Sequence, residues 1–397
     1  MAMNEQTGIV VVGAGIAGVT AVRGIRAANP DVAVTLVNGE TRLPYRRPQL
    51  SRHIHCGFAR EQFALEPESW YRDNAVEVLA GTQATRLDPV AKTLALTSGQ
   101  VLRWDRLILA TGAQARWPEG TIERLPGVFA LRDADSAEAL LSGLVGAHSV
   151  LIMGMGVLGI EIAEQTCQRG LATTMVHRGP APMERELTPR ASERLRQLLE
   201  GKGISLVFDR EVRSVIAAAD GLHVSWLGGE RVVDRVVACV GATPNTALAV
   251  AAGLAVQDGV LVDGHLRTSC PEVYAAGDCA QLHGAEVCHL WHCAEAMGRC
   301  AGLNAGGTPA PYHIRPFRLK CEVFGDYFFS MGLPRREQRV GLHLDEHESD
   351  GVYQCFVFRG NRLEAAVMVG DRNRARRYEE AVWGHWPREQ VLEVLPL

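Results

Sequence analysis

GIVVVGAGIAGVTAVRGIRAANPDVAVTLVNGE, residues 8–40, has three glycines at the point where a continuous apolar run ends. The run Ile9–Val12 is typical of a parallel strand buried on both faces, and a helix is expected after the glycines. The first glycine allows the tight turn, the second lets the backbone approach a pyrophosphate, and the third lets the helix pack on the strand. The helix start then faces the anion. The predicted contact residues are Gly13, Gly15, Ala17 and Gly18.

A second unit of the same kind occupies residues 148–178, HSVLIMGMGVLGIEIAEQTCQRGLATTMVHR. It runs from an apolar strand through a glycine turn and a helix to another strand. The apolar segment RVVACVG, which ends at Gly241, is expected to close this unit. Two such units in one chain predict two nucleotide-binding domains and an α/β fold with parallel sheets. The predicted contact residues of the second unit are Gly154, Gly156, Gly159 and Gly241.

The residue at the end of the second strand in each unit helps to select the nucleotide, because an acid there normally binds the adenosine ribose. In the first unit this position is Asn38, with Glu40 two residues later, and either side chain is a candidate for the ribose. In the second unit it is His177 followed by Arg178, and both can carry positive charge beside a 2′-phosphate. Arg185 offers a further guanidinium. The sequence therefore predicts NADPH as the preferred coenzyme, with NADH possible; the alternative is that this pair belongs to an ordinary solvated loop.

TSCPEVYAAGD, residues 268–278, is a buried strand that ends in a glycine and an aspartate. A strand that stops beside a flavin brings its last carboxylate to the ribityl chain; Gly277 allows the close approach and Asp278 accepts hydrogen bonds from the hydroxyl groups. The helix expected directly afterwards points its N-terminus at the flavin phosphates. A further buried strand ends in residues that are predicted to contact the same cofactor, Ala110, Thr111 and Gly112.

Composition excludes several classes of protein. The 397 residues suffice for two to three domains, and the formal net charge of −4 argues against a general nucleic-acid binder. No apolar run reaches the roughly 18 residues of a membrane-spanning helix. The first eight residues lack a basic segment followed by an apolar one, so export is not expected. The ten cysteines lack the spacing of a disulfide scaffold, and the sequence predicts a cytoplasmic protein with mostly free thiols.

With these motifs in this order, the sequence resembles the FAD-dependent pyridine nucleotide–disulfide oxidoreductase superfamily over about residues 8–310. The likeness is strongest to its rubredoxin and ferredoxin reductases, through Pro44-Tyr-Arg-Arg-Pro-Gln-Leu-Ser-Arg52 and, more loosely, the tail segment Leu319–Gly332. It implies two Rossmann-like domains, each a three-layer sandwich, plus a small C-terminal α+β domain. The expected domains are 1–112 with 243–310 for FAD, 113–242 for NAD(P)H, and 311–397 for the tail.

The resemblance also implies roles for individual residues. Arg47 and Pro48 would line the FAD site, and Arg52 would lie near flavin N5, paired with Glu161 of the second glycine motif. Trp291 would open a helix that faces the pyrimidine end of the flavin. The next residue, His292, is a candidate proton donor because an imidazole titrates near neutral pH.

Disulfide reductases of this superfamily carry redox cysteines near the position of Pro44–Pro48, whereas this chain has no cysteine before Cys56, which is expected to be inert. Electrons are therefore expected to leave the flavin directly. The segment CHLWHC, residues 288–293, contains metal-ligand residue types, but one short segment lacks the second cluster of a zinc site, so no metal is expected. Whether Cys288 and Cys293 form a redox pair or are two buried thiols stays open.

The sequence thus predicts an NAD(P)H-dependent FAD reductase that passes hydride from nicotinamide to flavin N5 and then electrons to an acceptor such as rubredoxin or ferredoxin. An acidic carrier protein would suit the basic tail residues, and a small-molecule acceptor is the other possibility. Two rival functions share this scaffold: a small-molecule oxidase or reductase, and a flavin-bound redox sensor or interaction protein. A monomer or homodimer without a membrane span is expected. The basic tail residues are Arg335, Arg336, Arg339, Arg372, Arg374, Arg376 and Arg377.

Overall fold

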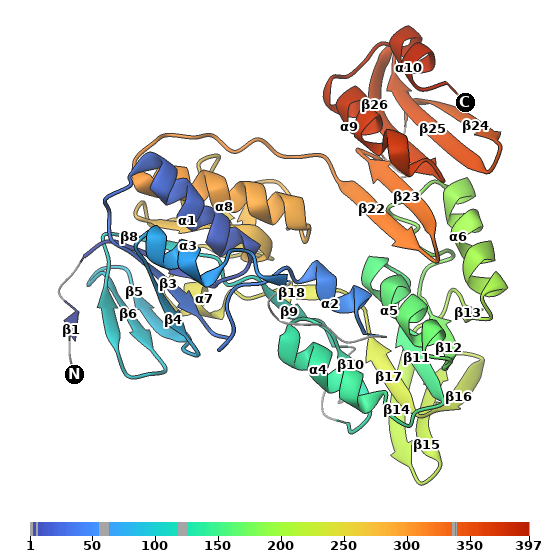
Figure 1. Ribbon diagram of the computed structural model, residues 1–397, viewed down its shortest axis with the longest axis horizontal. Helices are drawn as coiled ribbons and strands as arrows, with labels where there is room; N and C mark the ends of the chain where they lie inside the picture. Colours follow the sequence, from blue (N-terminus) through green and yellow to red (C-terminus); the bar gives the residue numbers. More distant parts are fainter. Residues whose placement is uncertain are drawn as a thin grey trace. The chain divides into compact units, whose positions relative to one another are not determined.

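The computed structural model describes residues 3–4, 7–54, 63–117, 125–335, 338 and 340–396. Contacts divide the chain into two compact units, each assembled from three stretches of sequence. The first unit comprises Met1–Leu50, Phe58–Ala115 and Gly241–Arg315. The second comprises Ser51–Gly57, Arg116–Val240 and Pro316–Leu397. The proposed three-domain division remains a prediction, and each unit is described below by itself (Figure 1).

The first unit is built on a five-stranded parallel sheet in the order β20-β8-β2-β3-β4. All four residues of its central strand β2 are buried, as expected for a strand covered on both faces. A second sheet, in the order β1-β7-β6-β5, belongs to the same unit. The strands are β1 Met3–Asn4, β2 Ile9–Val12, β3 Val34–Asn38, β4 Val76–Ala80, β5 Ala84–Asp88, β6 Thr93–Leu96, β7 Val101–Arg103, β8 Arg106–Leu109 and β20 Val273–Ala275.

Helices α1 (Ile16–Ala28) and α8 (Trp291–Gly306) lie side by side in this unit (Figure 1). Their close approach depends on glycine, because a Cβ on Gly298 or Gly302 would collide with backbone carbonyls of α1. The packing brings the start of each helix to the same end of the sheet. Shorter elements complete the unit: α2 Pro48–Arg52, which runs on into the second unit, α3 Glu68–Asp73, β9 Ala113–Ala115, β18 Ala242–Pro244, α7 Ala247–Ala251, β19 Val260–Val262 and β21 Ala280–Leu282.

The second unit repeats the parallel architecture, with five strands in the order β10-β17-β11-β12-β13. An antiparallel sheet of β14, β15 and β16 accompanies it. The elements are β10 Val128–Ala130, α4 Ala134–Gly143, β11 Ser149–Met153, α5 Val157–Gln168, β12 Ala172–Val176, α6 Pro189–Gly201, β13 Ser205–Val207, β14 Val212–Ala218, β15 Gly221–Trp226, β16 Gly229–Val233 and β17 Arg235–Ala238. The duplicated strand–glycine turn–helix–strand pattern is confirmed.

The tail forms a five-stranded antiparallel sheet in the order β22-β23-β26-β25-β24, with helices α9 and α10 packed on it. The turn at Gly360-Asn361, a residue pair typical of hairpins, joins β25 to β26, with Arg359 paired to Arg362. The elements are β22 Arg318–Val323, β23 Asp326–Met331, β24 His343–Ser349, β25 Val352–Arg359, β26 Arg362–Val369, α9 Ala375–Trp383 and α10 Arg388–Val394. The predicted fold class, two Rossmann-like parts with a small α+β tail, is confirmed.

Candidate functional site

The first glycine turn has the geometry of an anion cradle. Gly13 has a φ of 105°, and a Cβ there would collide with the carbonyl of Ala110. A Cβ on Gly18 would collide with the carbonyl of Gly13, so these glycines permit close backbone packing. At Gly15 no described atom lies within 4 Å of an added Cβ, and no described side chain caps α1. The helix start therefore lacks a side-chain cap among the described residues, and Gly15 leaves space beside it where a pyrophosphate would bind.

The second glycine turn repeats this geometry in the second unit. Gly154 has a φ of 104°, and a Cβ on it would collide with the carbonyl of Cys239 on the neighbouring strand end. Gly159 packs against the carbonyl of Gly154 in the same way. Gly156 opens α5 with no described atom within 4 Å of an added Cβ and without a side-chain cap from the described residues. Each unit thus presents one uncapped helix start behind a glycine turn.

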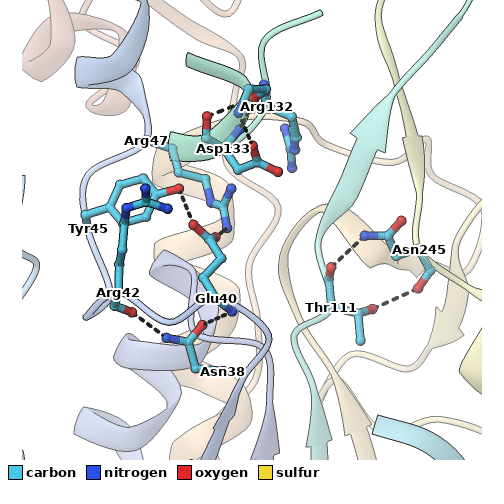
Figure 2. A network of polar contacts seen from close by, with 10 residues as sticks. Asn38, Glu40, Arg42, Tyr45, Arg47, Thr111, Arg132, Asp133 and Asn245 are labelled. Carbon is cyan, nitrogen blue, oxygen red and sulfur yellow. Dashed lines mark hydrogen bonds and ion pairs between the residues drawn. The ribbon is translucent and has the colours of Figure 1, made fainter. Parts of the chain in front are cut away.

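The two ribose candidates of the first unit have different surroundings (Figure 2). Asn38 is buried and shapes the turn: its amide donates to the carbonyl of Arg42 at 2.7 Å and accepts from the backbone N–H of Glu40 at 3.1 Å. The Glu40 carboxylate accepts from the Tyr45 hydroxyl at 2.7 Å and from Arg47 at 2.6 Å. Glu40 keeps acceptor capacity at a partly exposed carboxylate, whereas both polar atoms of Asn38 are used internally.

Thr111 and Asn245 tie together the segments that follow β8 and β18 (Figure 2). The Thr111 hydroxyl donates to the carbonyl of Asn245 at 2.8 Å, and the Asn245 side chain donates to the carbonyl of Thr111 at 2.9 Å. The backbone N–H of Asn245 also donates to the carbonyl of Gly112. Sequence reasoning missed Asn245, since nothing in its neighbourhood marks it as a partner. Gly241, predicted for the coenzyme site, belongs to the first unit by its contacts.

The Gly277-Asp278 motif lies against the first glycine turn. Gly277 has a φ of 79°, and an added Cβ would lie 2.8 Å from the Cβ of Ala17. Asp278 is half-buried, with a carboxylate oxygen 4.0 Å from Nδ1 of His289. The helix expected directly after Asp278 is wrong, because a single 3-10 turn over Gly277–Cys279 leads straight into β21. The next helix start is that of α8, at Trp291.

The start of α8 carries three side chains that the sequence singled out. Trp291 is half-buried in the first helical position, followed by His292 and the buried Cys293. No described side chain caps this helix. The Nε2 atom of His292 is buried and has no hydrogen-bond partner among the described residues. A buried ring nitrogen without a partner at an uncapped helix start fits a polar ligand bound there.

Arg52 and Glu161 are brought together in the second unit. Nε of Arg52, at the end of α2, donates to Oε1 of Glu161 at 3.0 Å, and Ser51 Oγ donates to Oε2 at 2.6 Å. Glu161 is buried on the first turns of α5, whereas the Arg52 side chain is 44% exposed. Arg169 supports the same segment by donating to the carbonyl of Ile54 at 3.1 Å. Ser51 is a partner that sequence reasoning did not single out.

The electrostatics of this pair favour a permanent cation at Arg52. Burial opposes the charge, but the charge and hydrogen bond of Glu161 outweigh that penalty and raise the pKa of Arg52 above its usual range. The charge of Glu322, on β22 of the tail, acts in the same direction. Glu164, one turn further along α5, accepts from the backbone N–H of Phe324 at 2.8 Å. The tail sheet is thereby fixed to the helix that holds Arg52.

The end of β12 differs from what the sequence predicted for a phosphate site. The backbone N–H of Met155 donates to Nδ1 of His177 at 3.3 Å, so this nitrogen keeps its lone pair. Burial lowers the pKa of His177; the charge of Glu184 opposes this shift, and Arg178 adds to it. The ring is therefore neutral at pH 7, and it does not supply the positive charge that a 2′-phosphate requires.

Glu184 occupies this position without having been expected there. The backbone N–H of Met183 donates to the carbonyl of Met155, which brings Glu184 back to the glycine turn. One Glu184 oxygen lies 3.9 Å from Nε2 of His177, and the other is buried without a hydrogen-bond partner in the described part of the chain. The absence of a side chain at Gly179 leaves room for this carboxylate, because an added Cβ would overlap it where it now lies. Five residues lie between Arg178 and Glu184, beyond the strand end where the pattern places the ribose-binding acid, so the sequence pattern did not reveal it.

The remaining predicted groups are placed as follows. Arg178 and Arg185 are both exposed. The basic tail residues described on α9 and just before it are paired with acids: Arg372 with Glu322, Arg374 with Asp371, and Arg376 and Arg377 with Glu380. Cys56, Arg336 and Arg339 lie outside the described residues. Within the described ranges, no three His, Cys, Asp or Glu side chains are grouped as a metal site. No helix there is both long and apolar enough to cross a bilayer.

The residues of the first unit fit FAD. The open space at Gly15, the uncapped start of α1, the half-buried Asp278 and the partnerless nitrogen of His292 belong to one compact unit. An anionic pyrophosphate suits the helix start, ribityl hydroxyl groups suit Asp278, and a polar ring edge suits His292. When bound, FAD would supply reversible two-electron redox chemistry.

Comparison with known proteins identifies two families whose sequence patterns match this chain. The family described as "Pyridine nucleotide-disulphide oxidoreductase" matches residues 7–298, and the "Rubredoxin NAD+ reductase C-terminal domain" matches residues 319–383. The chain belongs to the pyridine nucleotide-disulphide oxidoreductase family. The first match contains both glycine turns and Asp278, and the second contains most of the tail. The predicted resemblance is thereby confirmed.

Relatives within this family carry electron-transfer names. The chain is 32% identical over 371 residues to a rhodocoxin reductase of Rhodococcus erythropolis, covering 89% of this chain and 84% of the relative. It is 35% identical over 275 residues to a rubredoxin-NAD(+) reductase of Pseudomonas putida, covering 68% and 71%. Among solved structures, the ferredoxin reductase for the CYP199A2 system from Rhodopseudomonas palustris has a TM-score of 0.85 at 28% identity, covering 92% and 91%.

Proposed function

We propose that this chain is an FAD-containing reductase that oxidises NADH and passes the electrons to a small redox protein. The observation that carries the proposal is the pair of uncapped glycine-turn helix starts, one in each compact unit. Two such cradles bind two dinucleotides, and Asp278 beside the first cradle suits a flavin there. The names of the rubredoxin and rhodocoxin reductase relatives support a protein acceptor.

In this proposal the residues of the chain bind the two dinucleotides, orient the Arg52 side chain and stabilise the reduced flavin. The helix starts at Gly15 and Gly156 would hold the negatively charged pyrophosphates. Glu161 and Ser51 fix the Arg52 side chain, and the resulting cation would stabilise the negative charge of a reduced flavin ring. No redox cysteine is required by this arrangement. His292 is positioned to hold a proton beside a ligand at the start of α8.

The proposal is tested with purified protein and a set of acceptors. FAD should copurify, NADH should bleach the flavin under anaerobic conditions, and the reduced protein should be reoxidised fastest by a rubredoxin or ferredoxin. Fastest reoxidation by a quinone, another organic acceptor or O₂ would instead support a small-molecule reductase or oxidase. Slow reoxidation by every acceptor would support a redox sensor. Folded protein that neither contains nor takes up FAD would refute the proposal.

The coenzyme preference follows from Glu184 rather than from the arginines. A buried carboxylate oxygen without a partner among the described atoms is an acceptor for a ribose 2′-hydroxyl, whereas it would repel a 2′-phosphate. His177 is neutral, and Arg178 is exposed. We therefore infer that NADH is preferred, although the residue types alone predict NADPH. Names such as rubredoxin-NAD(+) reductase agree with this inference.

Steady-state kinetics with both coenzymes test this inference. Wild-type kcat/KM should favour NADH by about 10- to 100-fold, the size of one hydrogen bond to a charged group. Glu184→Ala should raise the KM for NADH and remove most of that preference, while Arg178→Ala should change little. Glu200→Ala, which removes an exposed acid on α6, is the control. A wild-type preference for NADPH that Arg178→Ala abolishes would overturn the inference and restore the prediction from the sequence.

A further inference from the structure

Two cysteines at the start of α8 line one small pocket of the first unit. Cys288 precedes the helix, and Cys293 is its third residue. Both face a cavity of about 40 Å³ whose wall includes Met297, Tyr312 and Arg315. A cavity of this size admits a molecule no larger than a few waters. Both cysteines are free thiols in this structure.

The surroundings make these two thiols chemically unequal. A hydrogen bond from the thiol of Cys288 lowers the pKa of Cys293; burial opposes the shift, and His292 and Arg315 favour it. The same hydrogen bond raises the pKa of Cys288, and burial adds to this effect. The uncapped helix start also stabilises a thiolate in the first turn. Because Cys293 lies in the uncapped first turn of α8 and Cys288 lies outside the helix, Cys293 is the thiol of the pair that the fold favours as the thiolate.

Two other described cysteines, Cys300 and Cys239, lack such an environment. Burial raises the pKa of Cys300, two turns further along α8, to about 11. Burial likewise raises the pKa of Cys239, behind the second glycine turn, to about 12. A thiol of this kind is inert because the thiolate is the reactive form. The contrast within one helix shows that the position of Cys293 at the pocket, rather than burial in general, sets its reactivity.

We propose that Cys288 and Cys293 form a peroxide-sensitive dithiol that a small hydroperoxide entering their shared pocket converts into an intramolecular disulfide. The proposal rests on residues of the first unit alone and does not depend on the proposed reductase function. The pocket has room for hydrogen peroxide, which is therefore the oxidant chosen for the test.

The chemistry balances with the peroxide as the two-electron oxidant. The Cys293 thiolate attacks one peroxide oxygen, the O–O bond breaks, and the other oxygen leaves as water or an alcohol after taking a proton. His292, whose side chain hydrogen-bonds Cys293, is placed to donate that proton. The Cys288 sulfur then attacks the Cys293 sulfenic acid, the S–S bond forms, and the S–O bond breaks. The thiol proton of Cys288 leaves with the hydroxide as a second water.

Peptide mapping by mass spectrometry tests the proposal on the full chain with its cofactor. After reduction and desalting, one equivalent of hydrogen peroxide should consume two thiols and yield one disulfide between the peptides that contain Cys288 and Cys293. When the pH is lowered from 8 to 6, the thiolate fraction of an ordinary thiol falls about 100-fold. The rate of Cys293 oxidation should fall much less than this over the same interval, because a lowered pKa keeps more of this thiol as thiolate.

Variants separate the two roles. Cys288→Ser should stop disulfide formation and leave a sulfenic acid at Cys293 that dimedone traps, whereas Cys293→Ser should abolish both products. Cys300→Ser, on the same helix, is the matched control and should behave like the wild type. The proposal is overturned if Cys293 reacts no faster than Cys300, if the oxidation rate follows an ordinary thiol pKa, or if the disulfide links other cysteines.

Discussion

Replacing Arg52 with Ala is expected to slow flavin reduction by NADH about 10- to 1000-fold in anaerobic stopped-flow measurements, the range found for single electrostatic contributors. The side chain is held by Glu161, which is buried and also accepts from Ser51, so the cation is oriented before any ligand arrives. Glu161→Gln should also slow flavin reduction by NADH, because a neutral amide no longer anchors the guanidinium of Arg52. FAD content should stay unchanged in both variants.

Arg190→Ala is the matched control for this experiment. Arg190 also belongs to the second unit and donates to a carboxylate, that of Glu348, at 2.9 Å, and its side chain is similarly exposed. Removing an exposed pair of this kind should leave the rate of flavin reduction unchanged. If Arg52→Ala reduces at the wild-type rate while a Cys288→Ser/Cys293→Ser double variant loses reduction, electrons pass through thiols and the direct-flavin mechanism is wrong.

Asp278→Ala is expected to weaken FAD binding by roughly 1–3 kcal/mol, or about 5- to 150-fold in Kd, because a buried ribityl hydroxyl group would lose its acceptor. Asp278 is half-buried directly after Gly277, whose backbone approaches Ala17 of the first glycine turn. The FAD affinity of Asp278→Asn should lie between that of Asp278→Ala and that of the wild type, since the amide keeps one acceptor oxygen. Flavin fluorescence after dilution measures the released fraction.

An exposed aspartate of the same unit provides the comparison for that measurement. Asp258 is exposed beside β19, so Asp258→Ala should retain FAD as the wild type does. Thermal unfolding of the apoproteins should give matching midpoints for the two alanine variants. Equal FAD affinity in Asp278→Ala and Asp258→Ala would show that the carboxylate does not contact the cofactor.

The glycine turns were predictable because their physics is local. Gly13 and Gly154 need positive φ values, and each stands within a few residues of the strand and helix it connects. An apolar run followed by such a glycine leaves few other structures for the chain. The hairpin at residues 360–361 was predictable for the same reason. Local sequence therefore decided the element order and the positions of both cradles.

The Arg52–Glu161 pair was expected only through the family resemblance, because 109 residues separate its members. Nothing in the chemistry of the residues between them requires the contact. Ser51, which completes the hydrogen bonds of Glu161, had no signal of its own. The missing helix after Asp278 is a similar case, since a 3-10 turn and a strand replace a feature expected from local pattern alone.

By itself, the sequence determined the α/β class, the two glycine cradles, the flavin motif and the family. Only the tertiary structure decided which charged and reactive side chains lie beside the glycine cradles and the flavin motif. It placed the half-buried ring of His177 against the backbone of Met155, returned Glu184 to the second cradle, and placed Cys288 and Cys293 in one pocket. Backbone turns are set by residues adjacent in the chain. The charge and reactivity of a side chain depend on burial and on partners that the fold brings together from distant segments.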